Sequence, residues 1–381
     1  MTTKQRRLKV GLVLDDSLDS TDGVQQYVCR IAEWLERSGH EVHFLVGQTK
    51  RTDLANIHQL SRNLRVRFNG NVMSMPLPTS KKLLRDTLDE LKLDVLHVQT
   101  PYSPFMAGRL MRLVPDETAV IGTFHILPYS RLVTAANSVL GLVNKNSGKA
   151  FDTMMAVSEP AKNFAKRTYG YDSVVVPNTV RVADFIDAKN QAPTPRIVFM
   201  GRLVERKGAM WLLKAVAYMN EHSLYTGEFE VIVGGKGEML PQLTRFVEDH
   251  ELETIVRFPG FVPEDEKASL LASGDITVFP STSGESFGIS LLEALAASRG
   301  VVLAGDNPGY RSVMYGFPDQ LFDPCDTPAF AALLAKWLSH TKGRQAIRKK
   351  QREYVNQFDI AVVGTAVEKI YREALQLRRV S

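Results

Sequence analysis

The chain has 381 residues, enough for two or three domains of about 100 to 200 residues each. A hydrophobic fraction of 44% and a charged fraction of 23% are typical of globular proteins and exclude disordered and fibrous chains. Only Cys29 and Cys325 are present, which excludes a disulfide framework and predicts a reducing compartment. The net charge of +5 favours an anionic partner only weakly. Without a membrane-length apolar run or an export signal at the N-terminus, the sequence predicts a cytoplasmic protein.

The first half of the chain alternates apolar runs with amphipathic stretches. An apolar strand is predicted at 8–14, a helix at 24–37 that ends before Gly39, and a second strand at 41–46. Further short apolar strands are predicted at 95–98, 120–124, 153–157 and 174–176. This order is typical of parallel α/β sheets.

A second series of strands follows the proline-containing stretch that ends at Pro195. These strands are predicted at 197–200, 229–233, 254–258, 276–279 and 301–303, and an amphipathic helix at 365–378. The junction lies between Pro177 and Pro195. The sequence therefore predicts two α/β halves that face each other across a cleft, with ligands at the carboxyl ends of both sheets.

The segment GESFGISLLE at 284–293 directly follows an apolar strand and carries two carboxylates eight residues apart, Glu285 and Glu293. A helix that begins near Ser286 would place Glu285 before it and Glu293 two turns inside. The free amides of the first turn, at Ser286, Phe287 and Gly288, would then suit an anionic or polyhydroxylated ligand. The alternative is that Glu285 only partners the helix dipole and Glu293 is solvated.

A basic turn, MGRLVERKG at 200–208, follows another strand and places Arg202 and Lys207 at its carboxyl end. Two cations on one rigid edge would hold a diphosphate, although a single basic turn can equally be exposed to water. Neither the P-loop nor the dinucleotide fingerprint occurs, so a kinase or a dehydrogenase is not supported.

Two features of the first half are further candidates. The loop TDGV at 21–24 precedes a predicted helix, where Gly23 could bring backbone amides to a phosphate or could simply serve a turn. His125 follows the strand AVIGTF, and His97 is a weaker candidate of the same kind. A single histidine is more often structural than catalytic, but its place at a strand end favours function.

Several motifs together resemble the retaining family 4 glycosyltransferases of GT-B fold. They are GESFGISLLEA, with the Glu285 and Glu293 pair, GRLVERKG, and the joint GYDSVVVPN. Within that family, DGVQQYVCRIAEWL, RVRFNGNV, LDVLHVQTPYSP and TFHILPYS are most similar to phosphatidyl-myo-inositol mannosyltransferases. The resemblance implies two Rossmann-like domains. An acceptor domain at 1–178 would carry a C-terminal helix, about 362–381, packed back on it, and a nucleotide-sugar domain would span 179–361.

The resemblance also implies roles for individual residues. Arg202 and Lys207 would hold the donor diphosphate, and Gly23 the distal phosphate. Glu285, with Ser286, Phe287 and Gly288, would bind the donor hexose, and Glu293 the nucleotide ribose. Gln25, Asn69 and His125 would lie on the acceptor side, with His125 near the transferred sugar. Arg202, Lys207, Glu285 and His125 are the expected catalytic residues.

The implied reaction moves a hexose, with mannose favoured, from GDP-mannose or a UDP-hexose to a lipid-linked or polyol acceptor such as phosphatidylinositol. No metal is expected, because no Asp-x-Asp motif occurs and GT-B enzymes usually work without one. Three residues depart from the family pattern, Asp22, Gln99 and Thr179. Glucosyl or galactosyl transfer to diacylglycerol and a non-catalytic sugar-nucleotide-binding protein remain alternatives. A nucleic-acid partner is not expected, because the basic residues are dispersed.

A predicted helix at 79–91 suggests a membrane contact. Leu84, Leu88 and Leu91 share one face, and Lys81, Lys82 and Arg85 lie near its start, a pattern that an anionic lipid surface would attract. An ordinary surface helix with solvated charges is the alternative. The apolar stretch 132–143 supports the membrane interpretation and, with the resemblance, a peripheral position on the inner face of the cell membrane. The sequence does not predict an oligomeric state.

Overall fold

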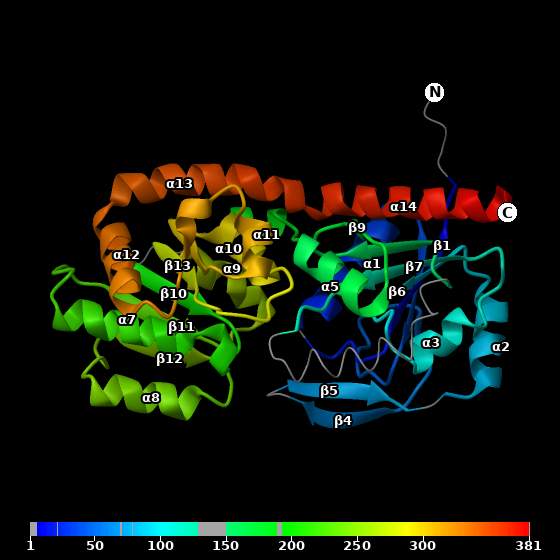
Figure 1. Ribbon diagram of the computed structural model, residues 1–381, viewed down its shortest axis with the longest axis horizontal. Helices are drawn as coiled ribbons and strands as arrows, with labels where there is room; N and C mark the ends of the chain where they lie inside the picture. Colours follow the sequence, from blue (N-terminus) through cyan, green and yellow to red (C-terminus); the bar gives the residue numbers. More distant parts are fainter. Residues whose placement is uncertain are drawn as a thin grey trace. The chain divides into compact units, whose positions relative to one another are not determined.

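A computed structural model describes residues 6–20, 22–68, 71–77, 79–128, 150–188 and 193–380. The chain forms two compact units. Unit 1 consists of Met1–Thr179 together with Ile360–Ser381, and unit 2 of Val180–Asp359. The last helix of the chain therefore belongs to the unit that contains the first strand (Figure 1).

Unit 1 is built on a seven-stranded sheet whose paired strands all run parallel, in the order β3-β2-β1-β6-β7-β8-β9. The strands are β1 (Lys9–Leu14), β2 (Glu41–Val46), β3 (Ile57–Gln59), β6 (Val95–Val98), β7 (Ala119–Phe124), β8 (Thr153–Ala156) and β9 (Val174–Val175). A separate antiparallel pair joins β4 (Asn63–Phe68) to β5 (Asn71–Pro76). The helices of its described residues are α1 (Gly23–Arg37), α2 (Lys81–Leu91), α3 (Met106–Met111), α5 (Glu159–Tyr169) and α14 (Ile360–Val380).

Helices cover both faces of this sheet. Successive residues of a strand point to opposite sides, so an apolar strand presents apolar side chains on both faces. Leu12 of β1 belongs to a core shared with α1 and α14, whereas Val13 belongs to a second core with α2 and α3. Such strands must be apolar on both faces, which explains the continuous apolar runs in the sequence. The helix α14 is fixed to this unit by Tyr371, whose side chain is fully buried.

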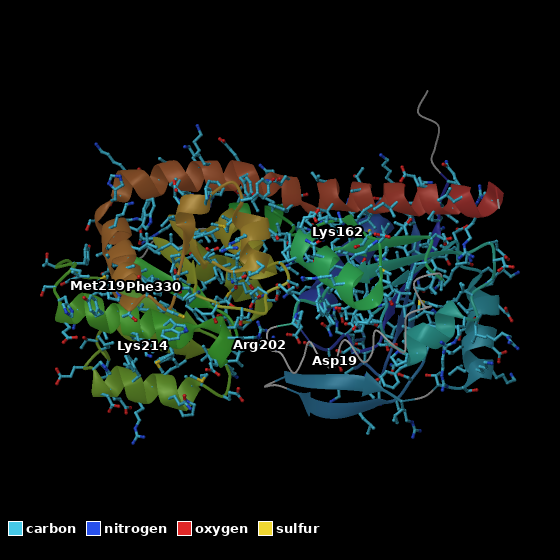
Figure 2. The ribbon with its side chains drawn as sticks, viewed as in Figure 1. Asp19, Lys162, Arg202, Lys214, Met219 and Phe330 are labelled. Atoms are coloured by element: carbon cyan, nitrogen blue, oxygen red, sulfur yellow. The ribbon has the colours of Figure 1, made fainter. Side chains whose placement is uncertain are left out.

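Unit 2 repeats this design with a six-stranded sheet in the order β12-β11-β10-β13-β14-β15, again with parallel pairs throughout. Its strands are β10 (Arg196–Met200), β11 (Glu230–Gly234), β12 (Val256–Gly260), β13 (Ile276–Phe279), β14 (Val301–Gly305) and β15 (Leu321–Phe322). Its helices are α6 (Ala183–Ile186), α7 (Ala209–Glu221), α8 (Leu240–Asp249), α9 (Glu264–Ala272), α10 (Ile289–Ala297), α11 (Pro308–Met314), α12 (Thr327–Ser339) and α13 (Thr341–Tyr354). Met219 of α7 and Phe330 of α12 lie in the same buried core (Figure 2).

The predicted α/β class with two parallel sheets is confirmed, but two details of the prediction are wrong. The hairpin of β4 and β5 was not predicted. The helix expected to begin near Ser286 begins at Ile289, so Ser286, Phe287 and Gly288 lie in the preceding loop and Glu293 is only one turn inside. Among the described residues, no helix combines the length and apolar character needed to cross a bilayer.

Candidate functional site

The carboxyl ends of β10 and β13, neighbours in the unit 2 sheet, bring the two predicted motifs together. The basic turn after β10 contains a short 3-10 helix, Glu205–Lys207, that ends at Gly208. Gly208 has a φ of +79°, and a Cβ there would lie 2.0 Å from the carbonyl oxygen of Pro280, just after β13. Only glycine permits this approach, so Gly208 fixes the basic turn against the loop that carries Glu285.

Glu285 is the centre of a buried ionic cluster. Its Oε1 lies 2.8 Å from Nζ of Lys207 and accepts a hydrogen bond of 2.7 Å from Nη1 of Arg206. The hydroxyl of Ser281 lies 3.2 Å from the same oxygen. Glu285 is 8% exposed, so these partners compensate most of the cost of burying its charge.

The protonation states of the cluster follow from burial and from the neighbouring charges. Burial raises the pKa of Glu285, but the charges of Lys207 and Arg206 outweigh it and leave this pKa below its ordinary value of 4.5. Burial lowers the pKa of Lys207, Glu285 raises it, and the charges of Arg206 and Arg202 lower it further, with a net lowering. The cluster thus holds more positive than negative charge at the sheet edge, a suitable arrangement for an anionic ligand.

The structure adds two residues that the sequence analysis missed. Arg206 belongs to the cluster, and its position next to Lys207 in the same basic turn could have identified it as a candidate. Tyr310, in α11, is 2% exposed, and burial together with the charge of Glu285 raises its pKa well above the ordinary value. Gly309 lets α11 approach the Glu285 loop closely, because a Cβ there would lie 1.9 Å from the carbonyl oxygen of Glu285.

The predicted residue Arg202 follows β10 and is half-buried (Figure 2).

The second predicted carboxylate, Glu293, lies inside α10 and is 1% exposed. The interpretation as a solvated helix residue is therefore wrong. Its Oε2 lies 3.8 Å from Nζ of Lys267, which also pairs with Glu264 at 2.7 Å. Gly288 precedes the helix with a φ of +122°, a backbone conformation that favours glycine. Phe287 is buried, so its side chain packs inside unit 2.

In unit 1, the acceptor-side candidates lie at the carboxyl ends of strands. His125 follows β7, is 8% exposed, and its Nε2 lies 2.9 Å from Oε1 of Gln99, which follows β6. Burial lowers the pKa of His125 to about 3, so the ring is neutral at physiological pH. Gln25 is also buried, and its amide donates to Oδ2 of Asp16 and to the carbonyl of Ser17, both at 3.2 Å.

The loop between β1 and α1 holds the remaining unit 1 candidates. Gly23 is the first residue of α1. The carboxylate of Asp22 accepts a hydrogen bond of 2.9 Å from the hydroxyl of Ser20. Asn69 lies outside the described residues, as do Thr21 and the stretch 132–143.

His97 is structural rather than a ligand of the site. It is fully buried, with Nδ1 2.6 Å from the hydroxyl of Tyr371 and Nε2 2.6 Å from Oγ1 of Thr123. Burial lowers its pKa to about 3. These bonds connect β6, β7 and α14, so they hold the C-terminal helix against the sheet.

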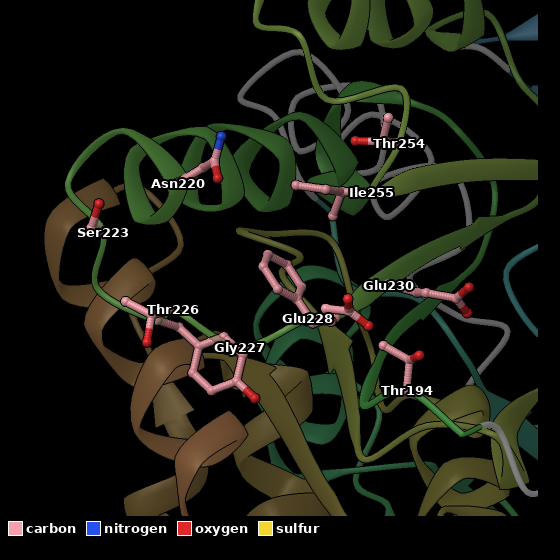
Figure 3. A pocket seen from close by; sticks show the side chains of 11 residues that line it. Thr194, Asn220, Ser223, Thr226, Gly227, Glu228, Glu230, Thr254 and Ile255 are labelled. Atoms are coloured by element: carbon pink, nitrogen blue, oxygen red, sulfur yellow. The ribbon is translucent and has the colours of Figure 1, made fainter.

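A pocket of about 570 Å³ lies elsewhere in unit 2 (Figure 3). Its lining comes from the residues before β10 and β12, the start of β11 and the end of α7, for example Thr194, Asn220, Glu228 and Thr254. These are the amino ends of the strands, opposite to the edge that holds Lys207, and the pocket contains none of the predicted site residues. Throughout the described part of the chain, no three His, Cys, Asp or Glu side chains come close enough to hold a metal ion.

Comparison with known proteins gives a match along most of the chain. Residues 183–354 match "Glycosyl transferases group 1", and residues 21–184 match "Glycosyltransferase Family 4". The chain is 30% identical to the phosphatidyl-myo-inositol mannosyltransferase of Mycolicibacterium smegmatis, over 96% of this chain and 93% of that protein.

Solved structures show the same fold. A glycosyltransferase from Rickettsia africae superposes with a TM-score of 0.75 at 18% identity, over 97% of this chain and 99% of that chain. The Anabaena protein HepE, solved with UDP and glucose, superposes with a TM-score of 0.69 at 15% identity, over 96% of this chain and 99% of that chain.

Proposed function

The chain belongs to the family 4 glycosyltransferases of GT-B fold, and from this we propose that it transfers mannose from a nucleotide sugar to a phosphatidylinositol-type lipid. The observation that carries the proposal is the cluster of Arg206, Lys207 and Glu285 at the carboxyl ends of β10 and β13. Unit 2 would bind the donor and unit 1 the acceptor.

The charge of the cluster supports a diphosphate leaving group. When the bond between the sugar and the diphosphate breaks, negative charge grows on the phosphate oxygens. Lys207 and Arg202 would stabilise that charge more strongly in the transition state than in the ground state. Glu285 would hold Lys207 in place and bind hydroxyls of the hexose, with Ser286, Phe287 and Gly288 beside it. Glu293 would bind the ribose, and Gly23 of unit 1 the distal phosphate.

We propose that the reaction retains the configuration of the sugar without a protein nucleophile. The bond from C1 of the sugar to the diphosphate breaks, and a bond from C1 to the acceptor oxygen forms on the same face. The proton of the acceptor hydroxyl passes to an oxygen of the leaving diphosphate, which balances the charge. His125, Gln25 and Asn69 would bind on the acceptor side, with His125 closest to the reacting hydroxyl.

A panel of nucleotide sugars tests the donor. A ligand that binds only the folded chain at about 100 times its Kd stabilises it by about 2.7 kcal/mol, which for a unit of this size raises the Tm by about 5 to 10 °C. We expect GDP-mannose to give the largest shift. A larger shift with UDP-glucose or UDP-galactose would instead support the glucosyl or galactosyl alternative.

A transfer assay then separates an enzyme from a binding protein. GDP-mannose is supplied with phosphatidylinositol or with diacylglycerol, and both the lipid product and free GDP are measured. Product on phosphatidylinositol supports the proposal. Donor binding without transfer or hydrolysis would support the non-catalytic alternative.

The helix α2 is proposed to contact an anionic membrane surface, with the chain peripheral to the bilayer. Its apolar residues Leu84, Leu88 and Leu91 are buried in the unit 1 core, so that face is not available to lipid. The start of the helix carries exposed Lys81, Lys82 and Arg85, together with Leu83, which is 45% exposed. Lys82 pairs with Asp86 at 2.7 Å, and the last turn is acidic, so the basic surface is confined to the start of the helix. The contact would therefore be mainly electrostatic.

Vesicle binding tests this contact. We expect the protein to bind vesicles that contain phosphatidylinositol or phosphatidylserine and not pure phosphatidylcholine, and to dissociate in high salt, because salt screens surface charges. A variant with Lys81→Glu, Lys82→Glu and Arg85→Glu should lose the binding. The matched control carries the same charge change on α13, at the exposed Lys342, Lys349 and Lys350. Equal loss in both variants would show that only net charge matters.

A further inference from the structure

The ends of two neighbouring strands place a glutamine amide directly against the acceptor-side histidine. β6 and β7 pair in parallel, with Gln99 just after the first and His125 just after the second. Oε1 of Gln99 lies 2.9 Å from Nε2 of His125. With Oε1 of Gln99 facing the ring, the hydrogen of the neutral imidazole lies on Nε2, because an amide oxygen can only accept a hydrogen bond. The lone pair is then on Nδ1.

We propose that Gln99 is a positioning residue that holds His125 in the tautomer protonated at Nε2 and thereby presents Nδ1 as a hydrogen-bond acceptor to a substrate hydroxyl. The identity of that hydroxyl rests on the proposed function. The orientation of the ring does not, because it follows from contacts within unit 1.

The backbone of Gln99 and the ring of His125 are held in place, but the side-chain nitrogen of Gln99 is buried without a hydrogen-bond partner among the described residues. Gln99 is 1% exposed, and its backbone amide donates to the carbonyl of Val13 at 2.9 Å. The ring of His125 packs edge-on against Tyr27, with 5.2 Å between the ring centres and 67° between the planes. The contact with His125 is therefore the side-chain contact that orients the Gln99 amide. An amide whose oxygen faces the ring fixes the tautomer, as the hydrogen-bond partners of metal-bound histidines do.

The amide matters because it orients the ring without charging it. A carboxylate at position 99 would accept from the same Nε2 hydrogen but would also stabilise the imidazolium ion. Tyr27, on α1, and His97, on β6, lie beside the His125 ring, and neither carries a negative charge at neutral pH. Asp15 lies at the end of β1, which pairs with β6, and burial raises its pKa to about 6. Burial alone lowers the pKa of His125 to about 3. With Gln99, the acceptor on Nδ1 is present throughout the physiological pH range.

Nitrogen NMR of the full chain labelled with ¹⁵N-histidine tests the proposal directly, with His125→Asn used to assign the signal. The expected wild-type spectrum shows His125 neutral, protonated at Nε2, and unchanged between pH 5.5 and 8. Gln99→Leu should give a mixture of tautomers, and Gln99→Glu should make the ring titrate within that range. An Nδ1-protonated ring in the wild type, or an unchanged signal in Gln99→Leu, would overturn the proposal.

Transfer kinetics provide the second readout. Gln99→Leu should lower kcat about tenfold and leave the KM for the donor unchanged, which is the pattern of an altered acceptor side. In Gln99→Glu, kcat should fall about tenfold for each pH unit below the raised pKa of His125, because only the neutral ring accepts. If Gln99→Leu lowers kcat only to the extent that it lowers the folded fraction of the protein, the role of Gln99 is purely structural and the proposal is overturned.

Two controls separate the possible failures. Tyr371→Phe removes a buried hydrogen bond from His97 and should lower the Tm by about 2 to 4 °C while the His125 signal stays in place. Asp15, at the end of β1, has a pKa raised to about 6 by burial, so the NMR signal and not the activity profile must identify the titrating group. If no donor is transferred by the wild type, the proposed function fails, yet the NMR result still decides the role of Gln99.

Discussion

Replacing Lys207 with alanine should lower kcat/KM for sugar transfer by two to three orders of magnitude, about the loss seen when one preorganised charge or donor is removed from a developing oxyanion. Lys207 is held by Glu285 at 2.8 Å beside Arg206, so its position is fixed before the substrate arrives. Steady-state kinetics with the nucleotide sugar identified by the thermal-shift panel measure this effect.

Stability should change far less than activity in this variant, because Glu285 keeps its hydrogen bond to Arg206. The matched control is Lys214→Ala. Lys214 lies on α7, away from the strand ends, with its Nζ 4.5 Å from the ring centre of Trp211 (Figure 2). We expect that control to retain activity. Wild-type turnover in Lys207→Ala would contradict the assignment of the donor site to this cluster.

Replacing Glu285 with alanine should remove both activity and a large part of the stability of unit 2. The change leaves Arg206 and Lys207 close together in a buried site without their counter-charge, and breaking a buried ion pair from one side costs about 3 to 5 kcal/mol. Denaturant unfolding, followed by near-UV circular dichroism, measures the loss. Glu264→Ala, which removes a carboxylate that is 54% exposed, should change stability by less than about 1 kcal/mol.

The loss should depend on pH in a predictable direction. The folded-state pKa of Glu285 lies below its ordinary value of 4.5, so its charge stabilises the folded chain above that value. This contribution disappears as the pH falls through the lowered folded-state pKa. The stability difference between wild type and Glu285→Ala should therefore be largest at neutral pH and shrink under acid conditions. A difference that is constant from pH 7 to pH 3 would show that packing and not charge is lost.

The strands of both sheets could be predicted closely because burial on two faces requires continuous apolar residues. The predicted strands at 41–46, 95–98 and 276–279 coincide with β2, β6 and β13. The hairpin of β4 and β5 was missed because its strands carry mixed polar and apolar residues, although the Asn-Gly sequence between them is a strong hairpin signal. The start of α10 was placed too early because Gly288, with a positive φ, ends an irregular loop.

The candidate site could be predicted only in part. Glu285, Lys207 and His125 could be predicted because each lies in a loop that follows a strand, and the carboxyl ends of parallel strands meet at one edge of a sheet. The sequence alone gave no distances between side chains. It therefore did not show that Arg206 binds the same carboxylate of Glu285 as Lys207, or that Gln99 contacts His125. It also could not show the burial of Glu293, which depends on how α9 and α10 pack. The roles given to the donor and acceptor residues remain predictions.

The division of the chain also bears on how the protein is made. Residues 180–359 are inserted between two segments of unit 1, and α14 contributes Tyr371 to the core of that unit. During synthesis, the ribosome completes unit 2 before α14 emerges. The core of unit 1 therefore cannot be completed until α14 is synthesised. Until then, the apolar surface that α14 will cover stays accessible to chaperones. The helix α14, which follows unit 2 in the chain, thus completes the unit that was begun before it.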